Sequence, residues 1–221
     1  MSCGEPIAPA FLVPLLGWLS LGGKARCCGA RIGGWTLLGE ALPGILLPLM
    51  LLAGFSWPAA LLSILACGQL YVAIATDGKY HELGDLNTGL ILLFGGGAAF
   101  ALSNWTFSVF LPHLYTAGAV LGIFLLLYVL GGLFKRDGLR QMGSGDVPLA
   151  AALGLFVGFP WALVLFNTAS AAAIIHAALI KRDLRAGIPF GVSMAIAAFL
   201  TLLVRCAWQL YRGGAVLPGA A

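Results

Sequence analysis

The sequence predicts an all-α fold, a polytopic transmembrane bundle of about seven helices, and two observations carry that prediction. First, 61% of the 221 residues are apolar and only 9% are charged, whereas an average soluble domain has about 25% charged residues. Second, the apolar residues gather in long stretches, and a helix needs about 20 of them to cross a bilayer. The lipid bilayer is therefore the expected surroundings of the chain.

Seven apolar stretches are long enough to be considered as spans, since shorter ones suffice where the bilayer thins. They are Thr36–Ala53, Trp57–Thr76, Leu86–Ser103, Tyr115–Phe134, Val147–Leu163, Asn167–Ile180 and Ile188–Trp208. The fifth and sixth are short and are divided near Phe159 and Pro160. A break over Asn104–His113 is expected to separate the third span from the fourth.

The basic residues predict the orientation of these spans. They form three small groups between apolar stretches, namely Lys24, Arg26 and Arg31, then Lys135, Arg136 and Arg140, then Lys181, Arg182 and Arg185. Cytoplasmic loops carry an excess of Lys and Arg, so the amino terminus is expected inside and the carboxyl terminus outside. Because the net charge of +4 is divided in this way, no nucleic acid is expected as a partner.

The first 35 residues differ from the rest of the chain. They hold three of the five cysteines, and their apolar stretch Phe11–Leu19 is too short to span a membrane. We expect a cytoplasmic or interfacial segment over residues 1–35, with one amphipathic helix lying on the membrane. The transmembrane domain is expected over residues 36–211.

Carboxylates are the most informative side chains, because the chain has only eight Asp and Glu in total. Asp77, Asp85 and Asp146 border apolar stretches, and ionisable residues at such positions are functional candidates by default. In the predicted orientation all three lie at cytoplasmic ends of spans, as a site built from two carboxylates requires. The alternatives are a helix-end carboxylate in a polar loop for Asp77 and a helix N-cap for Asp146.

Asp146 follows two glycines in Gly143-Ser144-Gly145-Asp146. Glycine permits a turn or an unwound segment beside the membrane, and open backbone there gives an extended peptide somewhere to bind. A Gly-x-Gly-Asp tetrapeptide is weak by itself in a chain with 31 glycines. Its weight comes from the combination with Asp77 and Asp85.

With these motifs the chain resembles the type IV prepilin peptidases, bacterial membrane aspartyl proteases that trim leader peptides from prepilins and type II secretion pseudopilins. The resemblance is collinear over nearly the whole chain. Its motifs are Asp77, Gly84-Asp85, Gly143 to Gly154, Pro14 to Leu19, Cys28 to Ile32, Glu40, and Ile188 to Gly191. Against the family pattern the chain is expected to be shortened at its amino terminus. Gly84 replaces a Pro and Pro148 replaces a Lys.

The resemblance implies a membrane-embedded aspartic endopeptidase in the bacterial inner membrane. Asp77 and Asp146 would be the catalytic pair and would share one proton, since two carboxylates that close cannot both ionise. Asp85, Gly143 and Gly145 would support the substrate or the loop. The implied substrates are prepilins or pseudopilins cleaved after a Gly at the cytoplasmic face.

The resemblance also brings two cofactors into question, zinc and S-adenosylmethionine, and we expect neither. The family's cytoplasmic domain resembles a zinc site of two Cys-x-x-Cys pairs, and tetrahedral zinc wants four ligands. Cys3, Cys27 and Cys28 are the only candidates there, and Ala25 stands where another ligand should be. We therefore expect no zinc and reduced thiols. S-adenosylmethionine, used by family members that methylate the new amino terminus, is not carried over.

Two other functions stay open. The first is a catalytically inactive family member that binds pilins or assists their assembly. The second is a small proton-coupled transporter that uses Asp77 and Asp146 as proton sites. A transporter should show an inverted repeat and broken helices, and neither is visible in the sequence.

Overall fold

The computed structural model describes residues 16–31, 34–80, 84–133, 143–175, 178 and 190–214. Every named element in these residues is a helix, which confirms the all-α fold. The helices are α1 (Leu16–Ser20), α2 (Gly34–Leu52), α3 (Trp57–Tyr80), α4 (Asp85–Leu102), α5 (Phe107–Leu133), α6 (Asp146–Val157), α7 (Trp161–Ile175) and α8 (Phe190–Gly214).

The chain divides into two compact units, residues 1–49 and 50–221. In the first, a loop between α1 and α2 is closed by a bridge between Lys24 and Arg31. The Ala25 amide donates to the Ala30 carbonyl across this loop at 2.8 Å. The border predicted between residues 35 and 36 stays a prediction.

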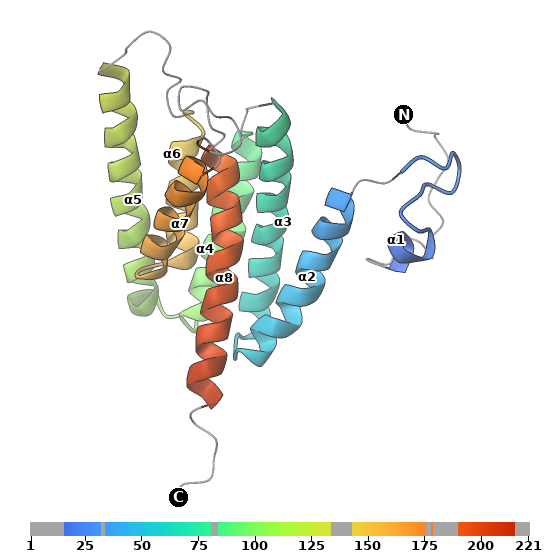
Figure 1. Cartoon of the computed structure of the whole chain (residues 1–221). Coiled ribbons are helices and arrows are strands. Elements are labelled where there is room, and N and C mark those ends of the chain that lie inside the picture. The colour runs from blue at the N-terminus through green and yellow to red at the C-terminus, as the bar shows by residue number, and fades with distance from the viewer. Residues whose placement is uncertain are drawn as a thin grey trace, which may run out of the picture. The chain divides into compact units, whose positions relative to one another are not determined.

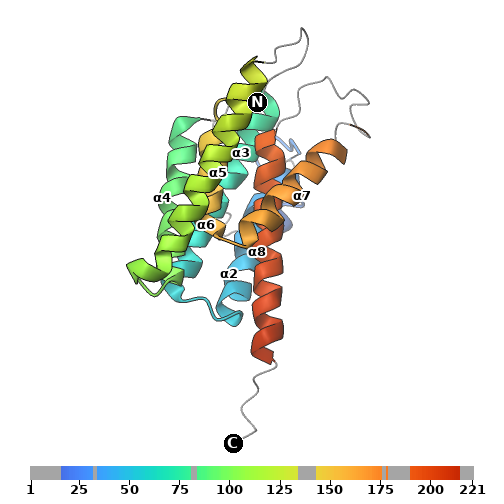
Figure 2. The ribbon, with the colours of Figure 1, turned by 90° about the vertical axis from the view of Figure 1, so that its left-hand side faces the viewer.

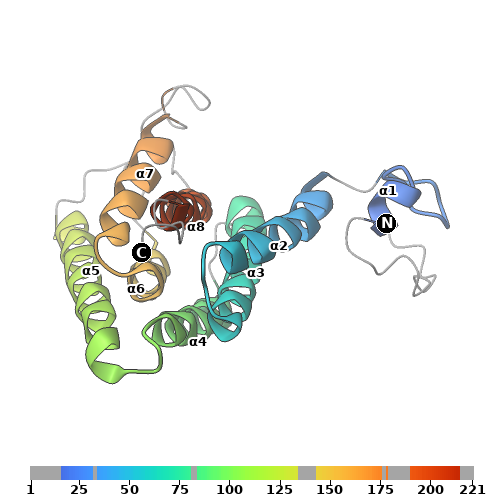
Figure 3. The same ribbon diagram turned by 90° about the horizontal axis from the view of Figure 1, so that it is seen from below.

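The second unit is a bundle in which α6 has the central place (Figures 1 and 2). This helix contacts α4, α5, α7 and α8, and the view along the bundle shows it among these neighbours (Figure 3). Its residues are buried except Pro148 and Ala151. A helix that is apolar on all sides belongs in such a core.

The outer helices expose large apolar side chains. On α5 they run through Leu121, Ile123, Leu125, Leu126 and Leu127, each at least 43% exposed. A soluble protein rarely exposes so large an apolar patch, whereas lipid tails cover it without cost. The bundle is therefore that of a polytopic membrane protein.

The predicted spans fall on α2 to α8. In the described part of the chain, α3, α4, α5 and α8 are long and apolar enough to cross a membrane. The other apolar helices are shorter, over Ala41–Leu52, Asp146–Val157 and Trp161–Ile175. The short α1, Leu16–Ser20, falls at the end of the Phe11–Leu19 stretch.

Two predicted boundaries were wrong. The break over Asn104–His113 is only a short turn, because Asn104 and Trp105 adopt positive φ angles of 50° and 59° and α5 begins at Phe107. The fifth span does not reach Leu163. Gly158, with a φ of 67° and a ψ of 175°, ends α6, and α7 begins at Trp161 instead of Asn167.

Candidate functional site

Asp146 is the first residue of α6 and is 6% exposed. Among the residues whose burial the structure describes, it is the only buried Asp, Glu, Lys or Arg. Its Oδ2 accepts a hydrogen bond from the Gly143 amide at 3.1 Å. The Asp146 amide donates back to the Gly143 carbonyl at 3.0 Å. This reciprocal pair fixes the carboxylate against the loop that precedes the helix.

The local backbone corrects one expectation and confirms another. The N-cap of α6 is Gly145 and no side chain caps the helix, so the alternative of Asp146 as N-cap was wrong. Gly145 has φ −71° and ψ −21°, an ordinary helical conformation that does not require glycine. Gly143 is exposed, and a Cβ there would lie 3.5 Å from Asp146 Oδ2. Residues 143 to 146 form the turn that the two glycines permit, with the Asp146 amide donating to the Gly143 carbonyl.

The other two candidate carboxylates are carried to the same end of the bundle. Asp77 lies in the last turn of α3, and its side chain is outside the described residues. Asp85 is the first residue of α4 and is exposed. At this position the helix dipole stabilises a negative charge. In Figure 1 the end of α3, the start of α4 and the start of α6 all lie at the upper end of the bundle. Helix α6 begins somewhat below the upper ends of α3 and α5.

Helix α4 sets the spacing between α3 and α6, since it packs against both. Three consecutive glycines make this possible. A Cβ on Gly95 would lie 2.9 Å from Phe156 Cβ, and one on Gly96 would lie 2.9 Å from Leu155 Cδ2. A Cβ on Gly97 would meet Leu62 of α3 at 3.3 Å. Such close approach is typical of membrane helices that pack through small residues, and it affects how far the Asp77 helix lies from the Asp146 helix.

Asn87 is a residue that the sequence analysis did not single out. Its Nδ2 donates to the Gln69 carbonyl of α3 at 3.1 Å, so it ties the first turn of α4 to α3 beside Asp85. Its Oδ1 is buried and makes no hydrogen bond in the structure. Such an orphaned acceptor usually has a structural or catalytic reason. The sequence offered one signal that could have identified Asn87, namely a polar amide side chain in the first turn of an apolar span, two residues after Asp85.

The cysteines do not fit a four-thiolate zinc site. Cys27 is disulfide-bonded, which corrects the expectation of reduced thiols in this segment, and Cys28 is a free, exposed thiol. Ala25 offers no donor at the position of a further ligand. Cys3 lies outside the described residues.

The fold and the buried carboxylate define a class, that of polytopic helical membrane proteins with a candidate acid site at one end of the bundle. Within this class, residues 63–178 match the profile of the Type IV leader peptidase family. Residues 1–53 match that of the Bacterial Peptidase A24 N-terminal domain. The first match contains Asp77, Asp85 and Asp146.

Curated relatives agree with these profiles. A prepilin leader peptidase/N-methyltransferase of Dickeya chrysanthemi is 30% identical over 91% of this chain and 71% of its own length. One of Pseudomonas aeruginosa is 32% identical over 91% of the chain and 69% of its own length. A protein of Escherichia coli named type 4 prepilin-like proteins leader peptide-processing enzyme is 30% identical over 92% of this chain and 74% of its own length. No solved structure matches. The chain belongs to the type IV prepilin peptidase family.

Proposed function

We propose that the protein is a membrane-embedded aspartic endopeptidase that removes the leader peptide of type IV prepilins or pseudopilins at the cytoplasmic face. The observation that carries the proposal is the buried carboxylate of Asp146 at the start of α6, at the same end of the bundle as the α3 turn that holds Asp77. A carboxylate buried in a membrane protein is costly and marks a working site. Membership of the family supplies the reaction class.

In the proposed mechanism Asp77 and Asp146 share one proton across a water-accessible pocket. The ionised carboxylate takes a proton from water, and the water oxygen attacks the scissile carbonyl carbon. The protonated carboxyl donates to the carbonyl oxygen. Collapse of the tetrahedral intermediate breaks the C–N bond, and a proton passes to the leaving amine. The pair titrates as a unit, so neither residue is assigned the proton.

The proposed substrate has a positively charged leader that stays in the cytoplasm and an apolar helix that enters the membrane. This choice rests on the relatives, which are named as prepilin leader peptidases. Asp85 is exposed at the start of α4 and is proposed to position the loop or the substrate. The exposed backbone at Gly143, close to the Asp146 carboxylate, is proposed as a place for the substrate backbone, and Gly145 as support for that loop. The proposal places the enzyme in the bacterial inner membrane.

The proposal needs no metal and no S-adenosylmethionine. The names of the relatives also include N-methyltransferase activity, and we do not extend the proposal to it. Hydrolysis by two carboxylates and a water molecule is complete without a further group.

The test is processing of a co-expressed prepilin, followed by the mass of the mature protein. The unaltered protein should remove the leader after a Gly. Asp77→Asn and Asp146→Asn should each lower the rate at least about a hundredfold, since each removes one member of an acid–base pair. Asp85→Asn should do less harm, because Asp85 is proposed to position the loop or the substrate and transfers no proton.

Abundance and membrane insertion of each variant are measured in the same cells. Normal processing by either Asn variant at equal abundance would refute the aspartyl mechanism. Failure of the unaltered protein to cleave any prepilin, while it still binds one, would instead favour the inactive assembly factor.

A further inference from the structure

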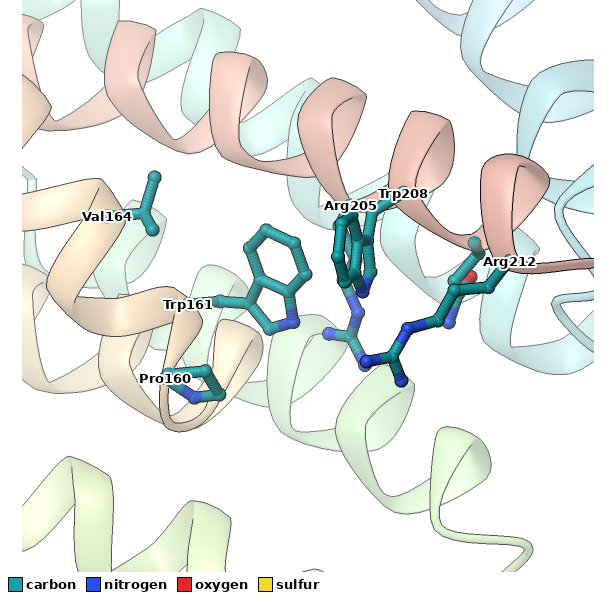
Figure 4. A pocket seen from close by; sticks show the side chains of 7 residues that line it. Pro160, Trp161, Val164, Arg205, Trp208 and Arg212 are labelled. Atoms are coloured by element: carbon teal, nitrogen blue, oxygen red, sulfur yellow. The ribbon is translucent and has the colours of Figure 1, made fainter.

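A second site lies at the end of the bundle opposite Asp146. It is a pocket of about 670 Å³ between the start of α7 and the last turns of α8, within the size range of small-ligand sites. Its lining consists of Pro160, Trp161, Val164, Arg205, Trp208, Gln209 and Arg212. Figure 4 shows these side chains, with both arginines reaching toward the same region beside Trp161.

Two like charges line this pocket. Arg205 and Arg212 are two turns apart on α8 and therefore on the same face, and both side chains line the pocket (Figure 4). No Asp or Glu is among the lining residues. Two guanidinium cations at one pocket, with no carboxylate in its lining, attract a negatively charged ligand.

The two arginines are held in place by different contacts. Arg205 Nη1 donates to the Val157 carbonyl at the end of α6 at 3.3 Å, and its guanidinium lies 5.7 Å from the centre of the Phe55 ring. Arg212 lies 4.8 Å above the Trp208 ring. A guanidinium has five N–H donors, so both groups retain donors for an anion. A planar guanidinium matches the geometry of phosphate oxygens.

The depth of the pocket identifies the source of that anion. Aromatic residues gather at this end, at the start of α3 and α7, in the turn after α4 and in the last turns of α8: Trp57, Trp105, Trp161, Trp208 and Tyr211. Trp and Tyr are enriched at the level of the lipid headgroups. The pocket therefore opens where phospholipid phosphates lie.

One further atom restricts the headgroup. Gln209 Oε1 is buried without a hydrogen-bond partner, and Gln209 lines the pocket. This oxygen is an acceptor without a donor, and a rotation of the Gln209 side chain would turn it toward a donor on a ligand in the pocket. A hydroxyl satisfies it without adding positive charge, whereas an ammonium group would add a third cation beside two arginines.

We propose that this pocket binds the headgroup of an anionic, hydroxyl-bearing phospholipid of the phosphatidylglycerol type. Arg205 and Arg212 hold the phosphate, Gln209 accepts from a headgroup hydroxyl, and the indoles of Trp161 and Trp208 flank the glycerol. The site is at the other end of α6 from Asp146 and does not depend on the proposed peptidase activity.

The test measures lipid binding to the purified full chain in a nonionic detergent, by native mass spectrometry and by the thermal unfolding midpoint. Phosphatidylglycerol should bind at least about tenfold more tightly than phosphatidylcholine. Arg212→Gln should weaken the binding of phosphatidylglycerol about tenfold, as expected for loss of a charge-assisted hydrogen bond. Arg212 is exposed, so this variant should fold normally. Lys24→Gln removes an exposed cation elsewhere and should change nothing.

A second variant tests the hydroxyl contact. Phosphatidylethanol carries the phosphate without a free hydroxyl. Gln209→Leu should therefore lower the affinity for phosphatidylglycerol to that for phosphatidylethanol, and it should leave the affinity for phosphatidylethanol unchanged. Equal binding of phosphatidylglycerol and phosphatidylcholine would overturn the proposal, as would equal effects of Arg212→Gln and Lys24→Gln. Glycerol 3-phosphate that binds as tightly as the lipid would show a site for a soluble anion, which also overturns it.

Discussion

At the scale of single residues, the lower end of α6 is held by a glycine and a histidine. Gly158 combines a φ of 67° with a ψ of 175°, a region that only glycine enters readily. His113 of α5 lies against it, and its Nδ1 is 2.9 Å from the Leu155 carbonyl of α6. This contact fastens α5 to the end of the helix that begins with Asp146.

Gly158→Ala should therefore lower the free energy of unfolding for two reasons. The backbone strain alone costs about 1–3 kcal/mol, and the new Cβ would lie 2.6 Å from His113 Cε1. Gly54→Ala is the control, because Gly54 also has a positive φ, of 82°, but nothing within 4 Å of a Cβ. Equilibrium unfolding in mixed detergent measures the loss of free energy of unfolding in both variants. Equal losses in the two variants would show that the His113 contact contributes nothing.

At the scale of helices, α4 acts as the spacer of the site. Its glycines allow contact with Phe156 and Leu155 of α6 on one side and Leu62 of α3 on the other. A side chain added at Gly95 would meet Phe156 Cβ, which cannot move without its helix, whereas at Gly96 and Gly97 it would meet the flexible ends of Leu155 and Leu62. A two-carboxylate site depends on the distance between α3 and α6, so the activity should be sensitive to a methyl group far from either carboxylate.

Gly95→Ala tests this idea. The added Cβ would lie 2.9 Å from Phe156 Cβ, and overpacking of this kind typically costs about 1–3 kcal/mol. We expect lower stability together with at least about a tenfold slower prepilin cleavage. Gly89→Ala on the same helix meets nothing within 4 Å and should be neutral or stabilising, because Ala favours a helix by up to about 1 kcal/mol over Gly.

The two assays are made on the same membranes. If Gly95→Ala is as active and stable as Gly89→Ala, the contact between α4 and α6 does not control the site.

At the scale of the whole molecule, the proposed chemistry requires one orientation in the membrane. Substituted-cysteine accessibility should place Lys24, Lys79, Arg136 and Arg182 in the cytoplasm, because the basic groups set the orientation. Asn104, exposed in the turn after α4, should be reached from the outside. If Lys79 and Arg136 report from opposite faces, Asp77 and Asp146 cannot meet and the shared-proton mechanism fails.

Much of this protein follows from its sequence alone. Composition and apolar stretches determine an all-helical membrane bundle, because a bilayer admits few other arrangements of a backbone. Scarce carboxylates at span ends single out Asp77, Asp85 and Asp146, since each such charge needs a reason to be there. Helix ends were less predictable. Asn104 and Trp105 make a tight turn that polarity could not distinguish from a longer break.

Only the tertiary structure decided which helix is central and what surrounds its ends. That α6 is enclosed by four neighbours, that Asn87 reaches α3 and that His113 closes on Gly158 depend on contacts between distant segments. The convergence of Arg205 and Arg212 beside Trp161 is of the same kind. Local sequence determines where a helix forms, whereas the packing of side chains from separate helices determines which of its faces make a site.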